Sequence, residues 1–181
     1  NNSIGFVAAD IGIKEAIKNA KKTGFALVGI KNSGHYGLSG YYAEQAVKKN
    51  LTALVFTNAP PAIAPHGALK TLFGTNPICF GTPTSSKVPF ILDSSVSMIN
   101  RGKIRVAARY GRKIPLGVAL DKFGNPTTDA KKALKGVQLP IASFRGSGFA
   151  WMVDILSGVL TGGNHGGKVK DPFDDFTGPQ N

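Results

Sequence analysis

Apolar and polar positions recur with two different periods in the first third of the chain. Residues 5–22 repeat apolar side chains at helical spacing with lysines between them, which predicts an amphipathic helix. Residues 25–30 and 51–57 are uniformly apolar runs between turn residues, a pattern typical of strands buried on both faces. Residues 38–49 show helical spacing again. The order helix, strand, helix, strand predicts an α/β fold in which the two strands are neighbours.

The rest of the chain predicts shorter elements around one long loop. Prolines and glycines between residues 58 and 76 predict a segment without regular structure. Residues 148–161 are apolar nearly all round, which predicts a helix enclosed by the core. The other expected elements are strands at residues 78–81 and 88–92, a helix at 100–110, a turn at 121–126 and a short helix at 129–134.

Composition and charge narrow the class of protein. The 181 residues include no apolar run near the ~18 residues that a membrane-spanning helix needs. Lys and Arg number 22 against 10 Asp and Glu, and this net charge of +12 attracts phosphates, carboxylates or nucleic acid. The single cysteine, Cys79, excludes an internal disulfide, so we expect a reducing, cytoplasmic location. Because the sequence begins without Met, we expect it to be part of a longer chain.

The basic stretch at residues 101–113 raises the alternative of a nucleic-acid-binding module. No zinc knuckle or helix-turn-helix signature accompanies that stretch. We therefore expect no nucleic-acid partner, and steep salt-dependent binding to a random duplex would contradict this expectation.

The loop at residues 33–40 carries His35 between a predicted strand and a predicted helix. Loops in this position build ligand sites in α/β folds. An imidazole with an ordinary pKa near ~6.5 exchanges protons at neutral pH, as a general acid or base must. The alternative is that His35 only ties the loop together through backbone hydrogen bonds. The residues alone leave both interpretations open.

The glycines of this loop do not form the usual dinucleotide fingerprint. Gly34, Gly37 and Gly40 lack the spacing G-x-G-x-x-G. The fingerprint also needs an acidic residue roughly 20 positions later, and none occurs between Glu44 and Asp93. An ordinary Rossmann fold is therefore excluded.

Two further segments combine glycine, hydroxyl groups and a lysine. Thr75 and Asn76 lead into a predicted strand, and residues 93–97 follow the next one, with Lys103 soon after. Such groups hold phosphates through backbone N–H groups and a point charge, although each is also common in turns and helix caps. No P-loop pattern is present.

Other polar residues give less information. His66 and His165 have no second ligand at helical spacing, so we expect no metal site. Asp154 lies inside the apolar segment 148–161 and is either paired in the core or on the helix surface.

Taken in order, these segments resemble the type-2 malate/L-lactate dehydrogenase family, which includes ureidoglycolate and sulfolactate dehydrogenases and diketogulonate and cyclic-imine reductases. The likeness spans nearly the whole chain, and the order of the motifs carries it more than any single motif does. The segments are Asn-Ser-Gly-His-Tyr-Gly at 32–37 with Gly-Tyr-Tyr at 40–42, Gly-Thr-Asn-Pro at 74–77, 93–97 with Gly-Lys-Ile at 102–104, Ile-Pro-Leu-Gly at 114–117, Asp121 with 124–129, and Arg-Gly-Ser-Gly-Phe at 145–149 with Met-Val-Asp at 152–154.

The resemblance implies a homodimeric oxidoreductase with a non-Rossmann nicotinamide-binding fold. It implies NAD or NADP as cofactor and a small 2-hydroxy or 2-oxo acid as substrate, most simply of the malate/oxaloacetate or lactate/pyruvate type. Residues 1–181 are then the central cofactor- and substrate-binding region, without an internal boundary. We expect the flanking helical segments, which hold a second histidine and a substrate-binding arginine, to be missing.

The resemblance also implies roles for individual residues. His35 exchanges a proton with the substrate oxygen, and Asp93 holds a polar partner in place as the second catalytic residue. Arg145 stands where the family usually has lysine, which keeps the charge but changes its geometry, and this raises the alternative of an inactive family member. The residues expected to contact the cofactor are His35, Thr75, Asn76, Asp93, Ser95, Ser97, Lys103, Arg145 and Gly146.

Overall fold

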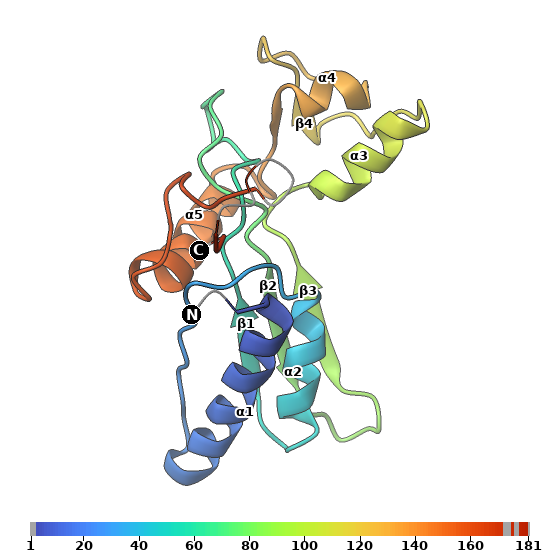
Figure 1. Cartoon of the computed structure of the whole chain (residues 1–181). Coiled ribbons are helices and arrows are strands. Elements are labelled where there is room, and N and C mark those ends of the chain that lie inside the picture. Colours follow the sequence, from blue (N-terminus) through green and yellow to red (C-terminus); the bar gives the residue numbers. More distant parts are fainter. Residues whose placement is uncertain (1–2, 172–174, 176–177, 181) are drawn as a thin grey trace.

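The computed structural model describes residues 3–171, 175 and 178–180, and it confirms the α/β class (Figure 1). Two helices are followed by three strands, and from α3 onward helices and short strands alternate. The elements are α1 (Gly5–Thr23), α2 (Ser39–Val47), β1 (Ala53–Phe56), β2 (Ile78–Thr82), β3 (Phe90–Ser94), α3 (Arg101–Arg109), β4 (Ala119–Leu120), α4 (Ala130–Leu134), β5 (Val137–Gln138), α5 (Phe144–Asp154) and a π-helical turn, Ile155–Val159.

Strands β1, β2 and β3 form an antiparallel sheet in that order. Helix α2 packs on one face of this sheet and α1 packs on α2 (Figure 1). Close packing is possible because Gly81 in β2 leaves room for Ala43 and Val47 of α2. The C-terminal end of β3 lies beside the start of α2, where Asp93 contacts Gly40.

The predicted strand at residues 25–30 is wrong, and so is its pairing with residues 51–57. The segment is extended but joins no sheet, and Phe25 is 75% exposed. It runs back along α1, where Val28 and Ile30 lie over Gly12 (Figure 1). An apolar run predicts that a segment is buried, but it does not determine which element the segment packs against. Here that element is helix α1.

A second layer is built from α3, α4 and the short β4–β5 pair. Its core consists of Ile104, Ile114, Val118, Ala119, Ala130 and Ala133. Both helices begin at capping side chains, as local sequence predicts: Asn100 accepts a hydrogen bond from the Lys103 N–H, and Asp129 accepts from two N–H groups of α4. The predicted helices at 100–110 and 129–134 are thus confirmed.

Helix α5 is not enclosed on all sides, which corrects the prediction for residues 148–161. Ala150 and Val153 are fully buried, and Ala150 packs with Ile63, Phe73 and Val96, while Trp151 is 49% exposed. Apolar side chains on every side allow a helix to be buried completely. How much of it is buried depends on the elements that pack around it. Within the described residues, no helix is long and apolar enough to cross a membrane.

Two glycines in α5 allow a matched test of this packing. A Cβ on Gly146 would collide with the carbonyl oxygen of Ile141, whereas a Cβ on Gly148 meets none of the described residues. We predict that Gly146→Ala lowers the free energy of unfolding by about 1–3 kcal/mol. Gly148→Ala should raise it by about 0.5–1 kcal/mol. Urea denaturation of both variants checks the pair, and equal effects would contradict the close approach at Gly146.

Candidate functional site

His35 is placed by the tight contact of its loop with the start of α1. Gly5, the first residue of α1, lies against the carbonyl groups of Gly34 and His35, and any side chain there would collide with them. The His35 ring is exposed, and its Nδ1 accepts a hydrogen bond of 3.0 Å from the N–H of Gly37. In the neutral ring the proton is therefore on Nε2.

Asp93 meets the same region from the sheet. Its Oδ2 accepts a hydrogen bond of 2.7 Å from the N–H of Gly40, in the first turn of α2. A carboxylate at this end satisfies a free N–H group and interacts favourably with the helix dipole. Because the His35 loop leads directly into α2, the two predicted catalytic residues are anchored to the same helix end.

Tyr36 is a further polar group of this region, which the sequence interpretation passed over although it lies next to His35. Its hydroxyl is 2.7 Å from Ser39 Oγ, and its carbonyl accepts a 2.7 Å hydrogen bond from the Tyr42 hydroxyl. Burial, with a smaller contribution from the Asp93 charge, raises the pKa of Tyr36 to about 12. The phenol is therefore neutral at physiological pH and remains a hydrogen-bond donor.

The backbone of Val96 connects the predicted cofactor-binding segments at Thr75 and at residues 95–97 with the chain before α5. Its N–H donates to the carbonyl of Thr75 at 2.9 Å, and its carbonyl accepts from the N–H of Ile141 at 3.0 Å. The neighbouring hydroxyls of Ser95 and Ser97 lie 3.1 Å apart. Thr75, Ser95, Ser97 and the chain that enters α5 are thus brought together.

Asn76 is fully buried, and both ends of its side-chain amide are used within the protein. Oδ1 accepts from the Ala59 N–H and Nδ2 donates to the Ala150 carbonyl, each at 3.0 Å. The side chain thus connects three segments that are far apart in sequence. This arrangement gives Asn76 a positioning role, through which it holds Thr75 beside Val96.

Arg145 and Lys103 lie on different helices. Arg145 is exposed in the first turn of α5, with its guanidinium 4.8 Å from the centre of the Phe144 ring, and Gly146 follows it against Ile141. Lys103, in α3, lines a hollow of about 340 Å³ together with Lys113. Met98 and Ile99, which follow Ser97 in the chain, line the same hollow.

Asp154 is paired in the core, which answers the question left open by the sequence. It is 5% exposed; Oδ1 accepts from the Asn58 side chain at 3.1 Å, and Oδ2 accepts from the Gly166 N–H at 2.8 Å. The same Asn58 amide donates to the Asn164 carbonyl at 2.8 Å. Asp154 therefore fixes the loop after α5 to the end of β1.

Comparison with known proteins identifies the family. The sequence profile described as malate/L-lactate dehydrogenase matches residues 1–181, and the chain belongs to this family. It is 42% identical over 174 residues to the malate/(S)-sulfolactate dehydrogenase of Methanothermus fervidus, covering 96% of this chain and 51% of the relative. It is 38% identical over 173 residues to the (2R)-3-sulfolactate dehydrogenase (NADP(+)) of Chromohalobacter salexigens, covering 96% of this chain and 52% of that protein.

A solved structure agrees with these matches. The sulfolactate dehydrogenase of Methanocaldococcus jannaschii superimposes with a TM-score of 0.85 at 40% identity, covering 93% of this chain and 48% of that chain. The resemblance to the family and its fold is thereby confirmed. The chain spans about half the length of the curated relatives it matches.

The Asp93 contact generates the second test. Asp93→Ala removes the acceptor for the Gly40 N–H and should lower the free energy of unfolding by about 0.5–2 kcal/mol, as for a lost helix cap. Asp93→Asn keeps an acceptor oxygen and should recover most of that loss. Ser94→Ala, the next residue on the same strand, is the control and should change stability by less than about 0.5 kcal/mol. If Asp93→Ala behaved like Ser94→Ala in denaturation, the contact would have no anchoring role.

Proposed function

We propose that the protein transfers a hydride between a nicotinamide cofactor, NAD or NADP, and C2 of a small 2-hydroxy or 2-oxo acid. The geometry of His35 is the observation that carries this proposal. His35 is exposed on the loop that leads into α2, and its Nδ1 accepts from the Gly37 N–H, which leaves Nε2 as the ring nitrogen without a partner in this loop contact. Membership of the malate/L-lactate dehydrogenase family supports the same chemistry. A homodimer in the cytoplasm is part of the proposal.

The residues of the site fit an anionic dinucleotide. Arg145 supplies an exposed positive charge at a helix start, where anions are favoured. The Ser95 hydroxyl and the Thr75 segment lie close to the chain that leads to Arg145. Asp93 adds an acceptor on the His35 side. These groups supply the donors, the acceptor and the charge that phosphate and ribose groups require.

The mechanism assigns the proton to His35. The cofactor, when bound, supplies or accepts the hydride. In the direction of reduction, negative charge develops on the substrate oxygen, and His35 in its imidazolium form donates the Nε2 proton there. The ring is left neutral with its remaining proton on Nδ1, so the Gly37 N–H contact must open during this step. In oxidation, Nε2 of that neutral form removes the proton again. Asp93 keeps the start of α2 and the preceding loop in place through Gly40. Tyr36 remains neutral beside Asp93 and adds no competing charge.

The substrate is proposed as a class, of the malate/oxaloacetate or lactate/pyruvate type. The relatives named for malate and sulfolactate widen the set of acids worth testing, because both compounds are 2-hydroxy acids with a second acidic group.

The basic residues of α3 favour the enzyme over a nucleic-acid-binding module. Arg101 donates to the Pro61 carbonyl at 3.0 Å, and Arg105 lies 3.4 Å from Asp171 in an ion pair. These guanidinium groups are engaged within the protein and do not form an open row for phosphates. We therefore propose no nucleic-acid partner.

His35→Asn tests the proton assignment. Asn Oδ1 can accept the Gly37 N–H in place of Nδ1 but exchanges no proton, so kcat should fall by about 10²–10⁴-fold while the melting temperature changes little. The measurement is the initial rate with NADH or NADPH and oxaloacetate, pyruvate or sulfopyruvate. His165→Asn, at another exposed histidine, should leave kcat unchanged.

Two results would contradict the assignment. A normal kcat for His35→Asn would remove the proton-transfer role. A loss of stability with kcat preserved would show instead that His35 only ties the loop together. No turnover of any of these acids by the unchanged protein would reject the proposed function itself.

Arg145→Ala tests the cofactor contact. Loss of a charge-assisted hydrogen bond of about 1.5–3 kcal/mol should raise the Kd of the cofactor roughly tenfold to 150-fold. Arg112→Ala is the matched control, since Arg112 also stacks on an aromatic ring, 5.4 Å from the centre of Tyr110. Fluorescence titration with NADH and NADPH compares the two variants. An unchanged Kd for Arg145→Ala would give Arg145 a structural role.

A further inference from the structure

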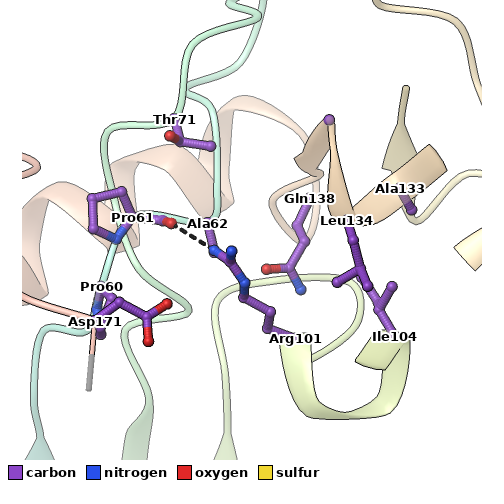
Figure 2. A pocket seen from close by; sticks show the side chains of 11 residues that line it. Pro60, Pro61, Ala62, Thr71, Arg101, Ile104, Ala133, Leu134, Gln138 and Asp171 are labelled. Atoms are coloured by element: carbon purple, nitrogen blue, oxygen red, sulfur yellow. Dashed lines mark hydrogen bonds between the residues drawn. The ribbon is translucent and has the colours of Figure 1, made fainter. Parts of the chain in front are cut away.

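The hollow lined by Arg101 and Gln138 uses polar groups within the protein. Arg101 donates to the Pro61 carbonyl at 3.0 Å (Figure 2), and the Gln138 amide donates to a backbone carbonyl. An exposed pair of side chains lies elsewhere, where the irregular segment between β1 and β2 meets the start of α5. It consists of His66 and Ser143. We call it the Ser143–His66 pair.

The Ser143 hydroxyl lies beside both nitrogens of the His66 ring. Oγ is 3.1 Å from Nδ1 and 3.4 Å from Nε2. In a neutral imidazole one of the two nitrogens accepts a hydrogen bond, so it can take a proton from the hydroxyl. A hydroxyl within hydrogen-bond reach of such a base is the arrangement that activates serine as a nucleophile. Both residues are exposed, so a solute can reach them.

The backbone at Ser143 has a conformation that favours glycine. Its φ is 59° and its ψ is −124°, and Ala142 before it also has a positive φ, 47°. The Ser143 hydroxyl makes no capping hydrogen bond to α5, whose residues are all described, so capping does not account for this conformation. Backbone strain of this kind costs free energy and clusters at functional sites. A sharp, strained turn into a helix is also how α/β-hydrolases expose their nucleophilic serine.

Two contacts hold the base against the helix that carries the serine. The N–H of His66 donates to the Oγ of Ser147, one turn along α5, at 2.8 Å. Ser147 is buried, and its own N–H donates to the Ser143 carbonyl at 3.4 Å. Nucleophile and base are therefore fixed to the same element, and the reaction needs no rearrangement to bring them together.

The start of α5 supplies a favourable place for negative charge. The first N–H groups of a helix lack acceptors inside the helix and form the positive end of its dipole. The N–H of Phe144 directly follows Ser143 in this first turn. When a serine oxygen attacks a carbonyl carbon, negative charge moves to the carbonyl oxygen, and fixed donors at that point lower the barrier.

We propose that Ser143 is the nucleophile and His66 the base of a second site, which hydrolyses activated carboxylic esters. Ser143 Oγ forms a bond to the acyl carbon while its proton passes to a ring nitrogen of His66. The C–O bond to the leaving group then breaks, and the leaving oxygen takes that proton. Water attacks the acyl carbon next, and His66 passes one of its protons to Ser143 Oγ as the carboxylic acid leaves. The reaction uses no nicotinamide cofactor and is separate from the proposed hydride transfer.

The pair suits esters whose leaving group is an acidic alcohol. Within the part of the chain that the structure describes, no carboxylate contacts the His66 ring, so the imidazolium formed during the reaction lacks the support that a catalytic triad gives. An acidic alcohol leaves with little help from a proton, whereas an amine does not. The site should therefore cleave activated esters and leave amides intact.

Release of p-nitrophenolate from p-nitrophenyl acetate, without added cofactor, tests the site. Ser143→Ala and His66→Asn should each lower the rate of the protein-catalysed reaction by about 10²-fold or more. Ser143→Cys keeps a nucleophile beside the base and should still be acylated. Ser85→Ala and His165→Asn, at other exposed positions, are the matched controls and should leave the rate unchanged. Thermal melting of each variant checks folding.

Mass spectrometry of the protein, quenched with acid during the reaction, locates the acyl group. The acetyl group should be on Ser143. Acetyl groups found only on lysine side chains would overturn the proposal, and so would an unchanged rate in Ser143→Ala.

Ser143→Gly separates the reaction from the strain. Because glycine adopts the observed φ at little cost, the melting temperature should rise by about 2–4 °C while acylation is lost. A lower melting temperature would show that the Ser143 hydroxyl only ties the His66 loop to α5, and it would overturn the assignment. Reduction of a 2-oxo acid without any ester hydrolysis would reject this site and leave the proposed hydride transfer standing. Ester hydrolysis at Ser143 without such reduction would do the reverse.

Discussion

The fully buried amide of Asn76 is the interaction on which the arrangement of the site depends. It connects the loop after β1, the start of β2 and the middle of α5 by two hydrogen bonds. A buried amide that loses a partner costs about 1–3 kcal/mol, so none of the three segments can shift alone without that penalty. The Asn58 amide, bonded to Asp154, fixes the same loop to the end of α5. With both in place, Thr75 and Val96 remain paired and the chain from Asp93 onward has a fixed path.

Local signals in the sequence predicted those elements whose causes are local. Helix α1 follows from its apolar spacing, and α3 and α4 begin where Asn100 and Asp129 supply caps. The predictions for residues 25–30 and for α5 were wrong for the same reason: both segments are apolar enough to pack against several different elements. Which partner is used depends on contacts distant in sequence. The β4–β5 pair, two residues long on each side, left no pattern to detect.

For the candidate site, the sequence supplied the residues and the structure shows where each of them lies. The motif around His35 and the order of the family segments pointed to His35 and Asp93, and the structure anchors both to the start of α2. Asn76 was expected at the cofactor, but a residue type does not reveal that both ends of an amide are occupied by Ala59 and Ala150. Gln138 carried no signal in the sequence, because its hydrogen bond to the Ile99 carbonyl forms only when β5 packs beside the segment that leads into α3.

The chain lacks the glycine fingerprint, and its polar candidate residues lie instead at the starts of separate helices. A Rossmann fold concentrates phosphate binding at one helix start, where glycines let the backbone approach the ligand. Here the polar groups come from side chains at separate helix starts: Asp93 at α2, Lys103 at α3 and Arg145 at α5. In the proposed function, the dinucleotide would contact several elements and not one helix start. Because each proposed contact is a single side chain on its own element, we expect a substitution at Arg145 to alter the cofactor contact without changing the proposed proton transfer at His35.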